Sequence, residues 1–401
     1  MSGATSSAPS RATNGVVSGV VNADPDVLIE VRGLCVDYGL GDDAVHAVVE
    51  ADLELRRGEV LGLAGESGSG KSTLAYAITR LLRSPGVITA GSARFAGSVN
   101  LLSAGQRELR GLRWNEIAVV LQSSMNALNP VLSIGTQFSD VLRAHRPGMS
   151  RADRQARSAE LLEMVGIPAD RLSSYPHELS GGMRQRVMIA TALALDPSVV
   201  IMDEPTTALD VVTQREILEE LMALRNRLGF AVLFISHDLS LLAEIADSIA
   251  VMYAGRLVER AGASAVFRAP RHPYSLGLLS SFPALHGPRR AMEGIPGSPP
   301  DLRNMPSGCP FHPRCGYALD RCRSDPPPLL ELDAGARAAA CWLQDGRVAV
   351  PAELARPAAA PPAAVPPAAV PPAAVPPAAV PPAAVPPAAA APEAEPTGGR
   401  S

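Results

Sequence analysis

The sequence predicts an α/β fold around a largely parallel sheet, and three observations support that prediction. Strand-like and helix-like segments alternate from residue 27 to about residue 260, which is typical of a parallel sheet with crossover helices. Two of the strand-like segments are almost wholly apolar, as expected of strands buried on both faces. A glycine-rich turn also joins one strand directly to a helix. The 401 residues are enough for two or three domains.

Each predicted element rests on hydrophobic periodicity between turn-forming residues. The expected strands are Val27–Val31, Glu59–Leu63, Ile117–Leu121, Val199–Met202 and Ala231–Ile235. The expected helices are Lys71–Leu82, Ile134–His145, Ala152–Val165, Met183–Leu195 and Val212–Leu228. Residues 265–350 are rich in proline and glycine, show little periodicity and hold four of the five cysteines. We expect them to form a small irregular extension.

The two ends of the chain differ in composition from the rest. Residues 1–26 contain one arginine and no sustained apolar stretch, so they are predicted to be a disordered lead-in and not a secretory signal. From Pro361 the motif PPAAV repeats five times, and such proline density favours an extended polyproline form. We therefore expect residues 351–401 to be a disordered, semi-rigid tail.

Charge and apolar run lengths limit the function classes. The net charge of −4 argues against a dedicated nucleic-acid binder, which usually carries a basic excess. The longest apolar runs, such as Val187–Leu195, fall short of the roughly 18 residues that a membrane-spanning helix needs. The sequence thus predicts no membrane span and a cytosolic location, where cysteines serve as metal ligands or free thiols rather than in disulfides.

The glycine-rich turn fits the phosphate-loop pattern G-x-x-x-x-G-K-[ST], between a strand and a helix as that pattern requires. The residues expected to bind nucleotide there are Gly65, Glu66, Ser67, Gly68, Ser69, Gly70, Lys71, Ser72 and Thr73. Backbone N–H groups and the helix N-terminus would hold phosphate oxygens, while Lys71 reaches the β- and γ-phosphates and Ser72 ligates Mg²⁺. The alternative, a Gly/Ser-rich surface loop, would match the pattern by chance about once in a thousand such chains.

Two further motifs follow the phosphate loop along the chain, and their order helps to identify the family. The run Leu179-Ser180-Gly181-Gly182-Met183 precedes a predicted helix and offers a second anion site. About 17 residues later, four apolar residues end in the paired carboxylates Asp203 and Glu204, at the carboxyl end of a strand where parallel sheets place ligands. This order resembles the ATP-binding-cassette (ABC) ATPases. The first run is similar to their signature motif and the carboxylate pair to their Walker B motif.

Four single positions extend the resemblance over about residues 27–260. Gln122 matches the Q-loop, Asp210 in Ala208-Leu209-Asp210 the D-loop, His237 the switch histidine, and Tyr38 the aromatic that stacks on adenine. The resemblance implies a P-loop NTPase of ABC type, with a RecA-like core, an antiparallel β-subdomain and an α-helical signature subdomain. The implied domains are residues 1–26, 27–264, 265–350 and 351–401.

The resemblance also implies a mechanism. Asp203 would hold Mg²⁺ together with Ser72 and Gln122, and Glu204 would act as general base on the attacking water. His237 would contact the γ-phosphate, and Gln122 would sense it and move with a membrane partner. ABC ATPases pair head to tail, so the signature residues would serve the nucleotide of a second ATPase subunit, which is either a paralogue or a second copy.

The extension narrows the family further. Arg271-His272-Pro273-Tyr274-Ser275-Leu276 and the later Gly308–Cys315 stretch resemble the C-terminal region of ATPase subunits of oligopeptide and dipeptide importers. The implied partners are two multi-span permeases and, indirectly, an extracytoplasmic peptide-binding protein, with no nucleic acid. The implied location is the cytoplasmic face of the membrane. Apolar side chains around Met125–Leu128 are candidates for docking a permease helix, with the core of the helical subdomain as the alternative. A nickel or other small-solute importer and a non-transport ABC ATPase remain as alternatives.

The cysteines of the extension are spaced C-x5-C-x6-C-x18-C, at Cys309, Cys315, Cys322 and Cys341. Structural zinc sites usually use C-x2–4-C pairs, which are absent here. Four thiolates on an irregular proline-rich frame favour a 4Fe–4S cluster, with zinc or free thiols as alternatives. His312 is a candidate substitute ligand.

Overall fold

Two β-sheets organise the protein in the computed structural model, which describes residues 24–39, 41–122, 127–207, 209–281 and 294–355. All of these residues belong to one unit, Met1–Ala359. The predicted lead-in up to residue 23, the tail from residue 356, Ala208 of the D-loop motif and Met125 of the docking segment lie outside the described residues.

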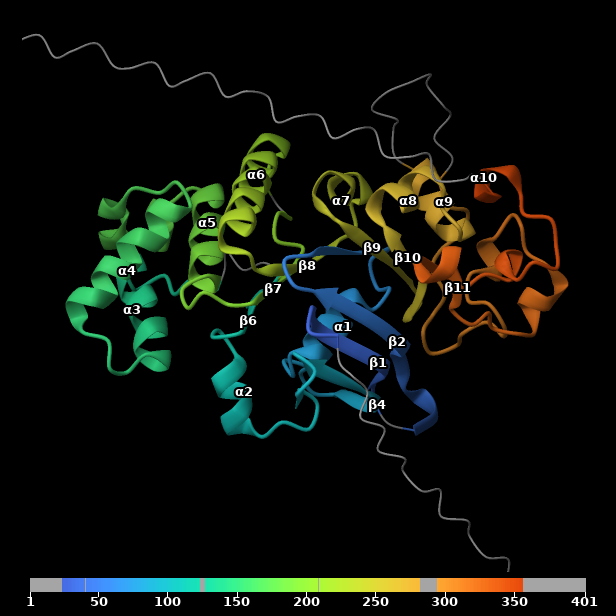
Figure 1. The fold of residues 1–401 in the computed structure, drawn as a ribbon, viewed down its shortest axis with the longest axis horizontal. Helices are drawn as coiled ribbons and strands as arrows, with labels where there is room; N and C mark the ends of the chain where they lie inside the picture. Colours follow the sequence, from blue (N-terminus) through green and yellow to red (C-terminus); the bar gives the residue numbers. More distant parts are fainter. Residues whose placement is uncertain (1–23, 40, 123–126, 208, 282–293, 356–401) are drawn as a thin grey trace, which may run out of the picture. The chain divides into compact units, whose positions relative to one another are not determined.

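The larger sheet has the order β11-β12-β10-β9-β3-β8-β7-β6 within the described residues (Figure 1). The strands are β3 (Val60–Ala64), β6 (Ile117–Val120), β7 (Val199–Asp203), β8 (Ala231–Ser236), β9 (Ser248–Tyr253), β10 (Arg256–Gly262), β11 (Leu330–Leu332) and β12 (Arg337–Ala339). The pairings from β6 through β7, β8 and β3 to β9 are parallel. This confirms the predicted largely parallel sheet.

The central strands are apolar on both faces because each face meets a different core. In β3, Leu61 and Leu63 pack into one core while Val60 and Ala64 pack into the other. Strands β7 and β8 alternate in the same way, as expected for the period of two in a strand. All five residues of β3, all five of β7 and all six of β8 are buried, so polar side chains appear only where the strands end.

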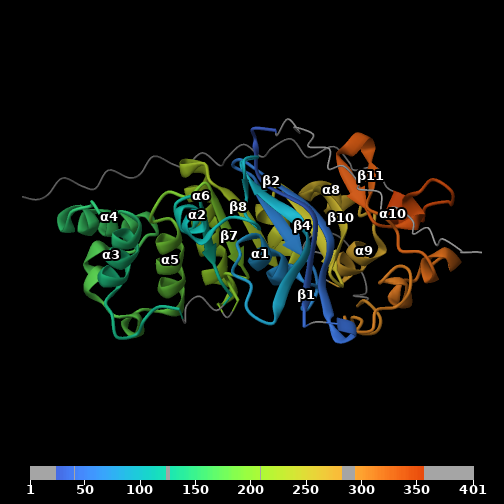
Figure 2. The same cartoon turned by 90° about the horizontal axis from the view of Figure 1, so that it is seen from below.

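A smaller antiparallel sheet, with the order β2-β1-β4-β5, packs on one of these cores (Figure 2). Its strands are β1 (Val27–Tyr38), β2 (Val45–Arg56), β4 (Gly86–Phe95) and β5 (Val99–Asn100). It is the antiparallel β-subdomain that the family resemblance implied. Periodicity located only the first residues of β1, since register shifts near Leu34 and Val36 interrupt its alternation.

The helices follow the predictions most closely where a capping residue marks their start. They are α1 (Lys71–Ile78), α2 (Gln106–Leu112), α3 (Ile134–His145), α4 (Arg151–Met164), α5 (Gly181–Ala192), α6 (Val211–Leu228), α7 (Leu239–Ile245), α8 (Ala263–Arg268), α9 (Pro273–Ser280) and α10 (Ala352–Ala355). Helix α3 has the predicted bounds. Helix α1 ends four residues before the predicted Leu82, because Arg80 takes a left-handed φ of 56°.

Helices α3, α4 and α5 contact one another, and α5 contacts β6 at one edge of the large sheet (Figure 1). These helices form the helical signature subdomain that the resemblance implied. None of the described helices is long and apolar enough to cross a membrane.

The extension joins the other edge of the same sheet, through antiparallel pairing of β12 with β10. Under this junction Glu259 of β10 is fully buried. Its carboxylate accepts hydrogen bonds from the backbone N–H groups of Arg271 (2.8 Å) and His272 (2.9 Å) and lies 3.5 Å from the guanidinium of Arg337. Burial raises the pKa of Glu259, and these partners oppose the rise. Arg271, His272 and Arg337 all belong to the extension, so the extension stabilises a buried charge of the cassette.

Candidate active site

The phosphate loop lies between β3 and α1, and two of its glycines are required by close approach. Gly65 has a φ of 147°, and a Cβ there would lie 2.2 Å from the carbonyl oxygen of Met252. Gly70 has a φ of 103°, and a Cβ there would lie 2.3 Å from the carbonyl oxygen of Ala47. No other residue type fits these positions without moving the backbone of β9 or β2. The glycines thus seat the loop on both sheets.

Lys71 opens helix α1 and is only 5% exposed. Its Nζ donates hydrogen bonds to the carbonyl oxygens of Gly65 (2.7 Å) and Glu66 (2.8 Å). Burial lowers the pKa of Lys71, and the charges of Glu204 and Asp203 partly oppose that effect. The ammonium group is therefore fixed inside the loop, beside the carboxylates that follow β7.

A cavity of about 680 Å³ opens over the loop and gathers residues from distant parts of the chain. Its lining residues are Tyr38, Val45, Ala47, Glu66, Ser67, Gly68, Ser69, Gly70, Lys71, Ser72, Thr73, Gln122, Glu204, His237, Leu278 and Leu302. Tyr38 also lies beside the loop, with its hydroxyl 3.4 Å from Thr73 Oγ1. The structure therefore brings together most of the nucleotide-binding residues that the sequence predicted.

Asp203 is fully buried at the end of β7 and is held by two hydroxyl groups. Ser72 Oγ donates to its Oδ1 (2.9 Å) and Tyr76 Oη to its Oδ2 (2.7 Å). Burial raises the pKa of Tyr76, and its hydrogen bond to the Asp203 carboxylate raises that pKa further. A serine hydroxyl beside an aspartate at the phosphate loop is the hard oxygen donor set that Mg²⁺ prefers, so the residues present fit the ion.

Glu204, the next residue, turns its carboxylate toward other partners. Gln122 Nε2 (3.0 Å) and Thr207 Oγ1 (3.2 Å) both donate to Glu204 Oε2. His237 Nδ1 lies 3.1 Å from Glu204 Oε1. The φ of Glu204 is 46°, a left-handed value that costs a non-glycine residue about 1–3 kcal/mol. This backbone turn separates the directions of two consecutive carboxylates.

The signature residues and the described D-loop residues lie elsewhere, and none of them lines this cavity. Ser180 caps α5 by accepting a hydrogen bond from the N–H of Met183 (3.2 Å), and Asp210 caps α6 by accepting one from the N–H of Thr213 (3.0 Å). A Cβ on Gly182 would lie 2.7 Å from Thr213 Cγ2, so the glycine allows the two helix starts to meet. The predicted residues Leu179 and Gly181 belong to the same turn.

Sequence reasoning missed several residues of the site. Tyr76 could have been found, because it lies one helical turn after Ser72 and shares its face. Leu278 and Leu302 of the extension line the cavity, but no local pattern signals this. The same holds for Tyr274, whose hydroxyl accepts a hydrogen bond from the N–H of Glu66 (2.8 Å). The extension thus reaches the phosphate loop.

The four cysteines of the extension line one small pocket, together with His272, Phe311, His312 and Trp342. None of these four cysteines forms a disulfide. Burial raises the pKa of Cys309 to about 11 and that of Cys341 to about 12, and repulsion from the other thiols adds to both shifts. Among the described residues, no group of three or more His, Cys, Asp or Glu side chains is placed to hold a metal ion. The four predicted cysteines thus line one pocket, but the described side chains there are not arranged as a metal-binding group.

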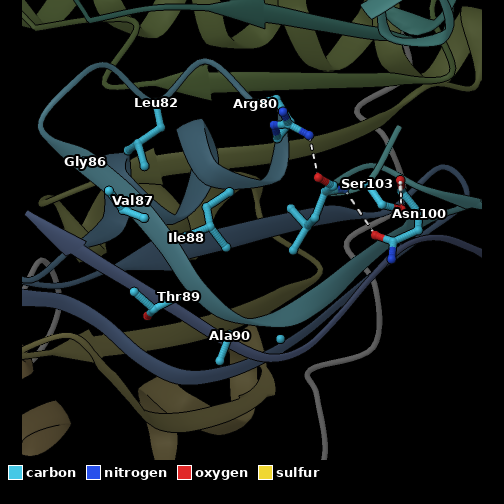
Figure 3. Close-up of a pocket in the computed structure, with 11 residues that line it drawn as sticks. Arg80, Leu82, Gly86, Val87, Ile88, Thr89, Ala90, Asn100 and Ser103 are labelled. Carbon is cyan, nitrogen blue, oxygen red and sulfur yellow. Dashed lines mark hydrogen bonds between the residues drawn. The ribbon is translucent and has the colours of Figure 1, made fainter. Parts of the chain in front are cut away.

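A second large cavity, of about 560 Å³, lies along β4 of the smaller sheet (Figure 3). Its lining includes Ile88, Thr89 and Asn100, and it shares no lining residue with the cavity over the phosphate loop. Its one cationic side chain, Arg80, donates to the backbone carbonyl of Leu102. With that cation already engaged, we assign no function to this cavity.

Comparison with known proteins agrees with this geometry. Residues 48–207 match the ABC transporter family, and residues 258–322 match the family of oligopeptide/dipeptide transporter C-terminal regions. The chain is 28% identical to the cassette MJ0796 in a dimeric structure of a post-hydrolysis state bound to ADP and Pi, with a TM-score of 0.53 over 59% of this chain and 99% of that chain.

Curated relatives cover most of both chains. The oligopeptide transport ATP-binding protein OppD of Salmonella typhimurium is 46% identical over 319 residues, which is 79% of this chain and 94% of that protein. The dipeptide transport ATP-binding protein DppD of Caldanaerobacter subterraneus is 41% identical over 322 residues, which is 80% of this chain and 98% of that protein. The chain therefore belongs to the ATP-binding subunits of the oligopeptide and dipeptide ABC transporter family.

Proposed function

We propose that this protein binds and hydrolyses ATP to drive uptake of di- or oligopeptides through a membrane permease. The observation that carries the ATPase function is the meeting of Ser72, Asp203 and Glu204 at the phosphate loop. The match of residues 258–322 to the oligopeptide/dipeptide transporter region supports the peptide substrate, as do the printed functions of the two relatives. Residues 27–264 would form the cassette and residues 265–350 the extension.

The geometry suggests a division of labour between the two carboxylates. Ser72 and Asp203 would hold Mg²⁺, with Gln122 as the third predicted ligand, and the bound ion would neutralise phosphate charge. Glu204 is tethered by Gln122, Thr207 and His237, so its carboxylate is oriented to accept a proton from the attacking water. Lys71 would pair with the phosphates, and His237 would contact the γ-phosphate.

The signature residues support a head-to-tail pair of cassettes. Ser180 is exposed at the N-terminus of α5 and is outside the cavity of its own chain. A helix start with a free face attracts anions, so Ser180 and Gly182 would meet the nucleotide of a second cassette. The related cassette MJ0796 is described as dimeric. In our proposal the pair docks on two permease subunits at the cytoplasmic face of the membrane, and a peptide-binding protein outside delivers the solute.

Reconstitution tests the proposed function. The chain, a second cassette subunit and two permeases are reconstituted in liposomes, with the binding protein on the membrane face opposite the ATPase subunits. Dipeptides, longer peptides and Ni²⁺ are offered separately on that face. We expect peptides to stimulate both phosphate release and uptake. Stimulation by Ni²⁺ alone would replace the peptide assignment, and ATP hydrolysis indifferent to permeases and solutes would show a non-transport ATPase.

The cysteine pocket supports a second, finer proposal, that Cys309, Cys315, Cys322 and Cys341 hold a 4Fe–4S cluster. Four thiols line one pocket with no acidic side chain among its lining residues, which is the soft donor set that iron–sulfur clusters use. In such a cluster each of the four thiolates binds a different iron. The cluster would supply a rigid crosslink among the four thiolates.

Anaerobic purification followed by absorption spectroscopy and metal analysis distinguishes a 4Fe–4S cluster, a zinc ion and four free thiols. We expect absorbance near 400 nm with about four irons per chain, and loss of both in Cys309→Ser. The variant Cys35→Ser, which changes the cysteine in β1, is the matched control and should keep the spectrum. One zinc per chain, or four titratable thiols with no metal, would refute the cluster.

A further inference from the structure

One residue of the phosphate loop, Glu66, is bonded to the extension through both its side chain and its backbone. Arg314 binds the carboxylate as a fork, with Nη1 2.8 Å from Oε2 and Nη2 3.0 Å from Oε1. Tyr274 Oη accepts a hydrogen bond from the N–H of Glu66. Bidentate arginine–carboxylate pairs are among the strongest and most directional polar contacts in proteins. The conformation of the loop at Glu66 is thus tied to residues more than 200 positions away.

The negative charge of Glu66 gives its contact with Arg314 an electrostatic effect on nucleotide binding. A carboxylate in a loop that receives phosphates repels them, and this one is 26% exposed and lines the cavity. The Arg314 side chain is only 6% exposed, so water screens the pair weakly on that side. The same contact raises the pKa of Arg314, which keeps its positive charge. Arg314 therefore neutralises a charge that would otherwise oppose nucleotide binding.

Arg314 is itself held firmly by its own segment. It ends the short 3-10 helix His312–Arg314, between Cys309 and Cys315. Its Nε donates to the carbonyl oxygen of Pro296 (2.8 Å), and its Nη1 to Tyr253 Oη (3.3 Å). A shift of either flanking cysteine would move this side chain.

An aromatic cluster continues the path from the cysteine pocket to the loop. Phe311 lines that pocket with the cysteines. Its ring centroid lies 5.4 Å from that of Tyr274 and 5.2 Å from that of Tyr253, and the two tyrosine rings are 4.5 Å apart. Closely packed rings move together because the interior is dense. Two routes therefore connect the cysteine segment with Glu66, one through Arg314 and one through Tyr274.

We infer that Arg314 is a positioning residue of the nucleotide site, through which the cysteine-containing segment 309–322 sets the affinity of the phosphate loop for ATP. This inference rests on the proposed ATP binding at the loop. It predicts that the Glu66 charge, once unpaired, weakens ATP binding. It also predicts that rearranging the cysteine segment weakens ATP binding more while the ion pair exists than after the pair is removed.

A double-mutant cycle with the full chain tests the charge argument. Equilibrium binding of a fluorescent ATP analogue with Mg²⁺ is measured for wild type, Arg314→Gln, Glu66→Gln and the double variant. Loss of a charge-assisted fork predicts that Arg314→Gln weakens binding about tenfold or more. The double variant should recover to within about threefold of wild type, because the repelling carboxylate is gone. Arg323→Gln, an exposed arginine beside Cys322, is the matched control and should bind like wild type.

The cycle separates the alternatives. If the double variant bound ATP as weakly as Arg314→Gln, the arginine would have a purely structural role and the inference would be overturned. Wild-type ATP affinity in Arg314→Gln would also overturn it. If wild type itself bound no nucleotide, the proposed function would fail instead. Circular dichroism melting of each variant confirms that the affinities compare folded proteins.

A second arm tests the connection to the cysteines. Cys315→Ser is made in the wild-type chain and in the Glu66→Gln/Arg314→Gln chain, and ATP affinity is measured as before. We expect about a threefold or larger loss in the first background and a clearly smaller loss in the second, where only the route through Tyr274 remains, because coupled residues are not additive. Equal losses in both backgrounds, or no loss in either, would refute transmission through the ion pair.

Discussion

Glu204→Gln is expected to lower ATP turnover by about 10²- to 10⁴-fold while ATP stays bound, since it removes a general base but leaves the phosphate loop intact. The amide can still meet Gln122, Thr207 and His237, which surround the carboxylate in the structure. The variant should therefore fold normally and accumulate with ATP in the paired cassettes. Phosphate release and the nucleotide retained after rapid gel filtration measure the two effects in the assembled complex.

The matched control for this variant is Glu219→Gln on α6. That carboxylate is 70% exposed and pairs with Arg215 at the surface, where ion pairs contribute little. Its loss should leave turnover unchanged. Phosphate release by Glu204→Gln at the wild-type rate would remove Glu204 from the role of general base.

Lys71→Arg is expected to lower turnover by about a hundredfold or more, although it keeps the charge. The Lys71 side chain is buried and its ammonium fits between the carbonyl oxygens of Gly65 and Glu66. A planar, bulkier guanidinium cannot take that place without moving the loop. Steady-state phosphate release and ATP affinity measure the loss. Arg57→Lys, the same exchange reversed at an exposed position, should have no effect.

The composition of the chain allows a chemical version of this experiment. Lys71 is the only lysine among 36 basic residues, so an amine-directed reagent has no other side-chain target. Burial lowers the pKa of Lys71, which increases its reactive neutral form at a given pH. Labelling of Lys71 should rise with pH and be blocked by ATP, while the α-amino group reacts regardless. Complete labelling of Lys71 with full ATPase activity would contradict its place at the phosphates.

The sequence predicted the central strands and several helices well because their local signals agree. Ser180 and Asp210 mark the starts of α5 and α6, and the apolar runs of β7 and β8 are too short for a helix and end at a polar residue. Strands β2 and β4 went unpredicted because register shifts in the smaller sheet blur the alternation on which prediction relies. Their stability comes from pairing with β1 and from the shared core rather than from local sequence.

At the nucleotide site, too, residues in contiguous motifs were predicted and residues brought in by the fold were not. The phosphate loop and the carboxylates after β7 are contiguous motifs, so spacing alone locates them. Arg314, Tyr274 and Leu302 reach the loop only through the fold of the extension, whose short strands and 3-10 turns have no period to detect. Long-range contacts of this kind leave no trace in a window of neighbouring residues.

The pairing of β12 with β10 has a practical consequence for dividing this chain. A fragment ending near residue 264 would expose the backbone edge of β10, and open sheet edges recruit other strands and cause aggregation. It would also strip Glu259 of Arg337 and of the N–H groups of Arg271 and His272, leaving a carboxylate uncompensated in the interior. The extension therefore covers the sheet edge of the cassette and protects it from aggregation. The shortest useful expression product contains both the cassette and the extension.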